Sequence, residues 1–378
     1  MIQPLLYTLA TSMPMFVCVF LSAGLGLDLC RNYDSPRIWL LLWSLTCSVL
    51  YACHFIFFHH ITSILPVTNT IYLACNLTVY PLYLIYIAHM TCEHVEKWLY
   101  ATLLFAPLLS AISAILYALM SHSEIQYFIY NVLYTKNYTT DNPLITAQIV
   151  LNFLSKLIFG AEIIMVFFVG RRYIKSYNQL VEKLYADTEE KQLHRMGVIL
   201  WLFISISLFS FIFNIIGRQI FDETLWLALP SILFSILLFA IADAGYHQRF
   251  SVQDIKKAFA HAEEQQQAPD PQPESEPDDN SLAQRFVHII DDERLFLQPN
   301  VQLQDICLRL GTNRTYLLEA LSKDLQMTFS EYINRRRIAY AQELKATHPE
   351  LSQAEIAIRS GYSATSSFYR NWKRYAGK

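Results

Sequence analysis

The ionisable residues in the least expected setting are Lys156 and Glu162, which lie inside an apolar run over residues 145–169. A charge at the centre of a bilayer costs about 2.5–3.5 kcal/mol on insertion scales, so such a residue usually faces other helices or a cavity. Asn152, four residues before Lys156, shares its helix face, whereas Glu162, six residues after it, lies about 120° around the helix. Asn152, Lys156 and Glu162 are therefore candidates for an intramembrane signal site that holds a small ligand. The alternative is that they only hold helices together.

No segment of the sequence carries a catalytic signature. The GxSxG, HExxH, P-loop and GxGxxG patterns are absent, so we expect neither an enzyme nor a cofactor. The seven cysteines show no CxxC or Cys/His spacing, which favours thiols packed as small hydrophobic groups. His54, His59, His60 and His122 stand at or beyond the ends of apolar runs, and we interpret them as solvated rather than as metal ligands.

Apolar runs long enough to cross a bilayer fill most of the first 245 residues. Hydrophobic residues make up 53% of the chain and charged residues 16%, against about 25% charged in ordinary soluble proteins. About 20 apolar helical residues cross the hydrocarbon core. Seven runs reach that length, at roughly 5–27, 38–58, 65–88, 98–120, 145–169, 198–216 and 225–244. The sequence predicts a seven-helix transmembrane bundle over residues 1–245, with the first run retained as a span rather than cleaved as a signal peptide.

Basic residues are unevenly distributed among the connections of this bundle. With the C-terminus in the cytoplasm, twelve Lys and Arg fall on the inner side and only Lys136 and Arg218 on the outer side. Cytoplasmic loops of membrane proteins are enriched in Lys and Arg. We therefore predict a multi-pass membrane protein with its N-terminus outside and its C-terminus in the cytoplasm.

The connection between the fifth and sixth runs carries an apolar stripe at helical spacing. The stripe consists of Ile174, Tyr177, Val181 and Leu184. Such a stripe could pair with a second copy of the chain, which would give a homodimer. The alternative is a solvated extension of the fifth span.

The chain changes character after residue 245. Residues 246–261 are predicted to form a juxtamembrane helix. Residues 262–280, AEEQQQAPDPQPESEPDDN, hold four prolines, seven acidic residues and no aliphatic residue larger than alanine. Such a segment cannot bury enough apolar surface to order itself, which predicts a disordered acidic linker.

Residues 281–378 show the periodicity of short amphipathic helices. A helix–turn–helix pattern occurs over 303–324, with its turn at Gly311, and again over 353–375, with its turn at Gly361. The expected helix N-caps are Asn313, Thr328, Ser352 and Ser363. Two such units joined by a long helix favour DNA binding, because their second helices can enter successive major grooves about 34 Å apart.

Three segments of this block are LQDICLRLGTNRTYLLEAL, TFSEYINRRRIAYAQEL and AEIAIRSGYSATSSFYRNWKRYAG. They resemble the AraC/XylS-type transcriptional regulators, especially the membrane-tethered members, and the resemblance covers about 80 of the 378 residues. It implies an all-helical DNA-binding domain over residues 281–378. It further implies that the third and last helices of the block enter the major groove.

The resemblance also implies which residues contact DNA. The base-reading candidates are Arg314 and Thr315 in the first unit and Thr365, Ser366 and Arg370 in the second, and the phosphate-contact candidates are Ser363, Lys373 and Arg374. Glu319 departs from the family by standing where a basic residue is common, and Gln326 replaces the usual glycine of a turn. A carboxylate facing DNA repels phosphate unless it accepts a hydrogen bond from a cytosine amine. The first unit is therefore expected to read DNA weakly or mainly to position the protein.

These features predict an all-α, membrane-bound one-component transcription regulator. Its membrane domain would sense an unknown signal, and its C-terminal domain would bind double-stranded promoter DNA. The helices around 174–184 and 250–259 are candidate couplers between the two. The alternative is a polytopic receptor or carrier whose helical tail binds protein partners rather than DNA.

Overall fold

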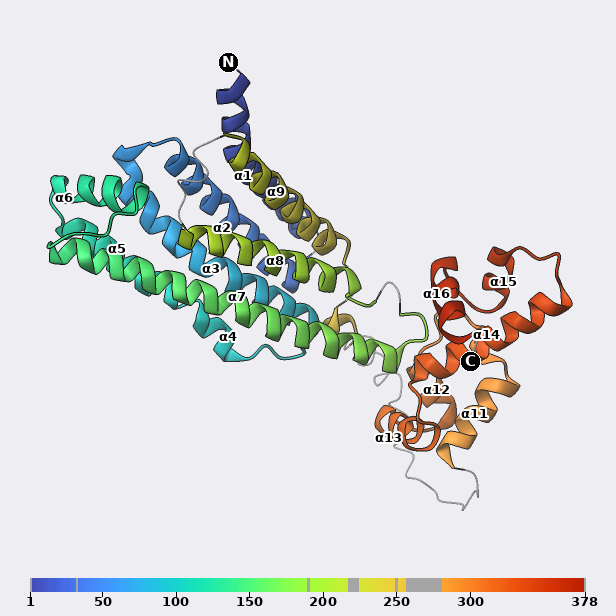
Figure 1. Ribbon diagram of the computed structural model, residues 1–378. Helices are drawn as coiled ribbons and strands as arrows, with labels where there is room; N and C mark the ends of the chain where they lie inside the picture. The colour runs from blue at the N-terminus through green and yellow to red at the C-terminus, as the bar shows by residue number, and fades with distance from the viewer. Residues whose placement is uncertain are drawn as a thin grey trace. The chain divides into compact units, whose positions relative to one another are not determined.

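The computed structural model describes residues 2–31, 33–188, 191–216, 224–248, 251–255 and 281–376, and these residues are helical apart from their connections (Figure 1). The all-α prediction is confirmed. The chain forms two compact units, each described separately below. The first unit consists of Met1–Ile174 and His194–Arg249, and the second of Lys175–Leu193 and Phe250–Lys378. The predicted linker over 262–280 and residues 256–261 of the predicted juxtamembrane helix lie outside the described residues.

The first unit is built from long apolar helices. In chain order the elements are α1 (Ile2–Arg31), α2 (Ser35–Phe58), the 3-10 turn η1 (Thr62–Ile64), α3 (Leu65–Thr91), α4 (Lys97–Thr102), α5 (Phe105–Leu119), α6 (His122–Tyr127), the π-helical η2 (Phe128–Tyr134), α7 (Pro143–Leu184), α8 (His194–Ile216) and α9 (Thr224–His247). The last eleven residues of α7 belong to the second unit, because the division falls after Ile174.

Helix α3 lies at the centre of the first unit. It packs against α2 on one side and α5 on another, while α1 packs against α2 and α9. Tyr80 of α3 contacts Phe159 of α7, with ring centroids 5.1 Å apart. Buried polar pairs add specificity between helices: Gln148 of α7 donates a hydrogen bond of 2.8 Å to the hydroxyl of Ser113 on α5. These contacts close the bundle around α3.

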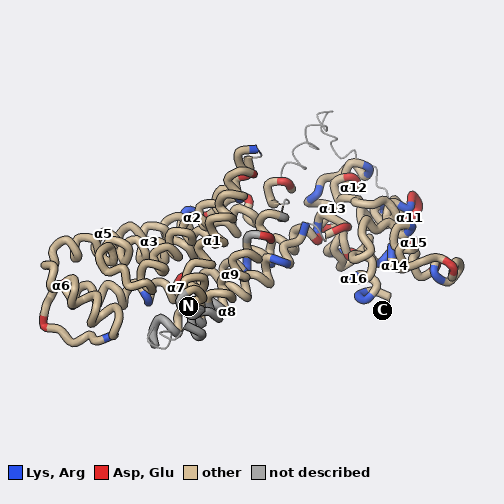
Figure 2. Tube along the Cα trace, turned by 90° about the horizontal axis from the view of Figure 1, so that it is seen from above, with Lys and Arg blue, Asp and Glu red and all other residues tan. Residues whose placement is uncertain are grey.

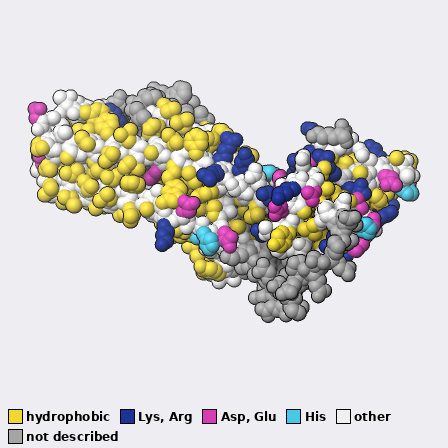
Figure 3. All heavy atoms as spheres, turned by 90° about the horizontal axis from the view of Figure 1, so that it is seen from below, with side chains coloured by type: hydrophobic (Ala, Val, Ile, Leu, Met, Phe, Trp, Pro, Cys, Tyr) yellow, Lys and Arg dark blue, Asp and Glu magenta, His cyan; other side chains and the backbone are white. Residues whose placement is uncertain are grey.

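Five helices of this unit are long and apolar enough to cross a membrane: Leu5–Arg31, Ser35–Phe58, Thr62–Thr91, Lys97–Leu119 and Pro143–Leu184. Large apolar side chains remain exposed on them, and hydrophobic side chains predominate on the face of the first unit seen in Figure 3. On α7 they recur at helical spacing, at Val150, Phe153, Leu157, Ile164 and Phe168. Five of the predicted spans are thus confirmed in length and apolar character, and the sixth and seventh, which coincide with α8 and α9, stay predictions.

The apolar stripe at the end of α7 is covered within the chain. Ile174, Tyr177, Val181 and Leu184 are each no more than 5% exposed. The following segment folds back on the helix end, where the amide of Leu193 donates to the Asn178 side chain at 2.8 Å. The stripe is therefore neither a solvated face nor an open surface for a second copy, and the homodimer stays a prediction.

The second unit contains short helices around one long one. Its elements after the end of α7 are α11 (Leu282–Asp292), the 3-10 turn η4 (Leu295–Leu297), α12 (Leu303–Leu310), α13 (Arg314–Ala320), the π-helical η5 (Leu321–Leu325), α14 (Phe329–Thr347), α15 (Gln353–Arg359) and α16 (Thr365–Tyr375). Figure 2 shows charged residues distributed throughout this unit and sparse along α1–α9.

Two glycines with positive φ end helices in the second unit, but only one of them is sterically confined. A Cβ atom added to Gly361, at φ 84°, would lie 2.7 Å from the carbonyl oxygen of Leu297. A Cβ atom added to Gly311, at φ 61°, would meet no atom within 4 Å. Both positions favour glycine for its conformational freedom, and Gly361 is also fixed by the backbone that it touches.

We expect Gly361→Ala to destabilise the second unit far more than Gly311→Ala. Each substitution should lower the free energy of unfolding by roughly 1–2 kcal/mol, because it places a residue with a Cβ in the left-handed conformation. Gly361→Ala adds a backbone clash that costs about 1–3 kcal/mol more. Pulse proteolysis in urea on the full chain in nanodiscs measures both free energies of unfolding. Equal losses for the two variants would contradict the packing at Gly361.

Candidate nucleic-acid interface

The first helix–turn–helix unit is formed by α12 and α13. Helix α12 ends at Gly311 in the left-handed conformation. Asn313 then caps α13, as predicted, because its side-chain oxygen accepts a hydrogen bond of 3.0 Å from the backbone amide three residues later. Leu317 is fully buried, whereas Arg314 and Thr315 are exposed. The two predicted contact residues therefore lie in the first turn of α13, on the surface of the unit.

The second helix–turn–helix unit is formed by α15 and α16. A capping box between Ser352 and Glu355 begins α15, as predicted. Phe368 anchors α16 in a cluster of buried side chains from α14, α15 and the turn between α15 and α16. The predicted cap at Ser363 is wrong: Ala364 occupies the N-cap position and makes no side-chain cap. The amide of Phe368 donates to the carbonyl of Ala364, so the helix begins one residue later than predicted.

The outer face of α16 gathers the predicted contact residues of the second unit. Thr365, Ser366, Arg370, Lys373 and Arg374 are all exposed, while Phe368 between them is 3% exposed. Ser366 and Arg370 are four residues apart, so they share one face of the helix. The exposed residue before the helix, Ser363, lies at its N-terminal end. This face can offer hydroxyl and guanidinium donors to base edges and two further cations to phosphates.

Helix α14 separates the two helix–turn–helix units. Helix α13 packs against α11 and α12, and α16 packs against α14 and α15 (Figure 1). The 19 residues of α14 span about 28 Å at the usual rise. Both second helices are therefore carried by one folded body.

Comparisons with known proteins agree with this geometry. A family model described as a helix-turn-helix domain matches residues 306–378. The Msm operon regulatory protein of Streptococcus mutans serotype c is 33% identical over 79 residues, which make up 21% of this chain and 28% of that protein. The chain thus aligns with less than a third of the length of this curated relative. No solved structure matches the chain.

Residues 306–378 form a helix–turn–helix domain of the AraC type. The predicted resemblance is confirmed for this part of the chain. The AraC-type domain includes α13, α16 and the turn before α16, and it contains every residue predicted to contact DNA.

Two departures of the AraC-type domain from its family have a local structural account. Glu319 is exposed and pairs with Lys323, whose ammonium lies 2.6 Å away. The hydrogen bond from Lys323 holds the pKa of Glu319 below its usual value, so this carboxylate stays ionised beside a cation that offsets its charge. Gln326 ends η5 with φ 53°, so it keeps the left-handed turn that a glycine usually provides.

The three consecutive arginines of α14 are engaged within the second unit. Arg335 pairs with Glu331 at 2.6 Å, and Arg336 pairs with Asp291 of α11 at 2.7 Å. Arg337 is completely buried. This basic run therefore holds the body that carries α13 and α16.

The chain beyond α7 is built into the second unit. Residues 185–187, here called the docking segment, begin with an isolated antiparallel bridge to Gln302. The amide of Ala186 donates to the carbonyl of Val301 at 3.4 Å, and its carbonyl accepts a hydrogen bond of 3.0 Å from the side chain of Asn334 on α14. Each residue of the segment is at most 8% exposed. The sequence did not reveal this contact, because a short segment that pairs across more than a hundred residues has no periodicity of its own.

A buried ion pair fixes the docking segment to α14. The Nη1 atom of Arg337 donates to Asp187 at 2.8 Å. The other two nitrogens of the guanidinium donate to the carbonyls of Phe296 at 2.7 Å and Gln298 at 2.8 Å. The second carboxylate oxygen of Asp187 accepts from the amide of Asn300 at 2.9 Å. Such complete pairing is what a buried charge requires.

The three predicted intramembrane residues do not form one site. Asn152 and Lys156 line the same cavity in the first unit. Glu162 is absent from that wall and is 4% exposed. Its carboxylate oxygens accept no hydrogen bond within the described part of the chain. The spacing had already indicated that Glu162 lies on a different face from Lys156.

We expect Arg370→Ala to weaken specific DNA binding by about tenfold or more, because a bidentate arginine–guanine contact is worth about 1–3 kcal/mol. The fold should survive, since Phe368 anchors α16. Fluorescence anisotropy of a labelled DNA site, titrated with the full chain in nanodiscs, measures the affinity.

The matched control is Arg309→Ala. Arg309 is exposed on α12 and pairs with Glu293 at 2.5 Å. Loss of an exposed pair contributes little to stability, so affinity should stay within about twofold. If the two variants bind alike, α16 does not read DNA through Arg370.

Proposed function

We propose that this chain is a membrane-bound one-component transcription regulator. Its first unit lies in a lipid bilayer and receives a signal, and its AraC-type domain binds double-stranded promoter DNA sequence-specifically. The observation that carries the proposal is that one chain joins five long apolar helices to an AraC-type domain. The end of one of those helices belongs to the same compact unit as that domain.

In this proposal α8 and α9 complete a bundle of seven spans. An odd number of spans places the two ends of the chain on opposite sides of the membrane. The bias of Lys and Arg toward one set of connections supports an outer N-terminus and a cytoplasmic AraC-type domain, in a bacterial inner membrane.

The proposed DNA contacts divide by chemistry. Thr365, Ser366 and Arg370 face base edges, and Ser363, Lys373 and Arg374 contact phosphates. Arg314 and Thr315 of α13 form a second, weaker reading element. The Glu319–Lys323 pair lowers the net positive charge near α13, which supports a stronger role for α16 in specificity.

Helix α7 supplies the proposed coupling between signal and DNA. It is a single helix of 42 residues. It carries Asn152 and Lys156 in the first unit and leads directly into the docking segment, which binds α14 in the second. A change in the position of α7 would thus act on the body that holds α13 and α16. A homodimer would convert that change into altered spacing between two DNA-binding units.

Crosslinking in intact cells followed by sequencing of the bound DNA tests this function. We expect discrete promoter sites that share two sequence elements about 34 Å, or one helical turn, apart. Arg370→Ala should deplete these sites, and Arg309→Ala should retain them at equal protein level.

The same experiment tests the orientation, since a domain outside the cytoplasm cannot reach the chromosome. Recovery of no specific DNA with the wild-type chain would reject the proposal. It would favour a receptor or carrier whose helical tail binds protein.

A further inference from the structure

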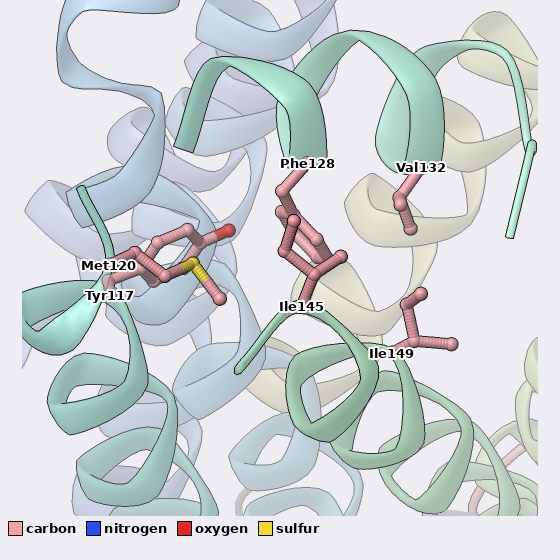
Figure 4. Close-up of a cluster of buried hydrophobic side chains, with 6 residues drawn as sticks. All are labelled: Tyr117, Met120, Phe128, Val132, Ile145 and Ile149. Carbon is pink, nitrogen blue, oxygen red and sulfur yellow. The ribbon is translucent and has the colours of Figure 1, made fainter. Parts of the chain in front are cut away.

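A partly open cavity of about 90 Å³ lies within the first unit, lined by α2, α3, η2 with its following loop, and α7. Val132 of η2 and Ile149 of α7 line it, and both belong to the buried cluster shown in Figure 4. Figure 4 shows these two side chains extending toward each other from their separate helices. The volume holds a ligand of roughly six to nine non-hydrogen atoms, on the measure of one small probe sphere for each water.

The charge of the lining is entirely positive. Lys156 projects from the apolar run of α7, and Lys136 comes from the loop that precedes this helix. No Asp or Glu is among the described residues that line the cavity. Within the apolar run of α7 the ammonium group of Lys156 favours an anion, because its field is poorly screened there.

A hydrogen-bond donor beside Lys156 lacks an acceptor. The Nδ2 atom of Asn152 is buried and makes no hydrogen bond within the described part of the chain. Asn152 lines the cavity one helical turn before Lys156. A buried donor left unsatisfied costs about 1–3 kcal/mol, and a ligand oxygen placed here would remove that cost.

The rest of the wall combines apolar side chains with neutral polar ones, among them Asn69 and Asn76 of α3. Phe57, Phe153 and Phe159 contribute aromatic rings from α2 and α7. The ammonium of Lys156 lies 5.5 Å from the centre of the Phe153 ring, so charge and aromatic surface adjoin. Aromatic surface beside convergent polar groups is a feature of small-molecule sites.

We propose that this cavity binds a small organic anion, whose carboxylate or similar oxyanion contacts Lys156 and Asn152 and whose apolar body packs on the phenylalanines. This proposal names the chemical class of the signal. That the bound anion acts as the signal rests on the proposed function, whereas the binding itself does not. A free metabolite or the headgroup of an anionic lipid could supply the same group. Glu162 takes no part, because it is not on the cavity wall.

The probe for this site is 3,3,3-trifluoropropionate, with its neutral amide as the isosteric control. Binding is followed by fluorine NMR line broadening on the full chain in phosphatidylcholine nanodiscs, without DNA. We expect the carboxylate to bind the wild-type chain at least about tenfold more tightly than the amide, since hydrogen bonds to charged groups are the stronger ones.

Lys156→Met should weaken carboxylate binding about tenfold and leave amide binding unchanged. Its insertion should not suffer, because the change removes a charge from an apolar run. Asn152→Leu keeps both lysines and should weaken the carboxylate about threefold or more. Lys175→Met removes a charge from α7 outside the cavity and should match the wild type. Circular dichroism confirms equal helicity in each variant.

Nanodiscs containing phosphatidylglycerol distinguish the two sources of the anion. If the lipid headgroup occupies the site, the wild-type chain will bind the probe more weakly in phosphatidylglycerol nanodiscs than in phosphatidylcholine nanodiscs. Probe binding to Lys156→Met will then be the same in both lipids. Equal binding in both lipids supports a free small anion. The proposal is overturned if wild type binds carboxylate and amide alike, or if Lys156→Met binds the carboxylate as wild type does. DNA recovery is independent of this result, so either claim can fail alone.

Discussion

The second unit depends on the hydrogen bonds of one buried guanidinium. Arg337 is 0% exposed, and a buried cation without partners would cost several kcal/mol. Its three partners come from two distant stretches of chain: Asp187 from the docking segment, and two carbonyls from the η4 turn and its end. The ring of Tyr362, in the turn between α15 and α16, lies 5.1 Å from the guanidinium carbon. One side chain thus ties α14 to the connection that leads into the first helix–turn–helix unit and contacts the turn of the second.

The docking segment links the long helix α7 to the unit that carries both helix–turn–helix units. Arg337 lies within α14, which stands between the two recognition helices, and Asp187 follows directly on α7. The second unit, which carries α16, therefore includes the C-terminal end of the long apolar helix α7 and the segment that follows it. Because the docking segment follows directly on α7, folded chain connects that helix to the AraC-type domain, and the proposed coupling follows from this connection.

The sequence predicted the features of this chain that local chemistry determines. Asn313 and Ser352 were recognised as caps and Gly311 as a helix end because the necessary atoms lie within a few residues of one another. The sequence placed the start of α16 one residue early, because Ser363 has a better capping side chain than Ala364, which occupies the N-cap position. The helical spacing identified the apolar stripe from Ile174 to Leu184, but it could not predict which segment of the chain packs against that stripe.

The candidate sites divide in the same way. The helical period placed Asn152 and Lys156 on one face and Glu162 on another, and the structure agrees. The walls that α2 and α3 add could not be inferred, because they come from residues far away in the chain. Asp187 gave no signal, since an acidic residue in a connecting segment is ordinarily solvated. Only the fold brings it to Arg337.

The central claim is that the docking segment is an integral part of the DNA-binding unit. Hydrogen exchange at the amides of α14, in the full chain in nanodiscs, gives the free energy of unfolding of this unit. Asp187→Ala should lower it by about 3–5 kcal/mol, because it leaves a buried charge unpaired. In an Arg337→Met background the same change should cost at least about 2 kcal/mol less, since no charge is then stranded. Asp292→Ala, an exposed carboxylate of α11, should stay within about 0.5 kcal/mol of wild type. The account is wrong if Asp187→Ala lowers the free energy of unfolding no more than Asp292→Ala does. It is also wrong if the loss caused by Asp187→Ala is the same in the wild-type and Arg337→Met backgrounds.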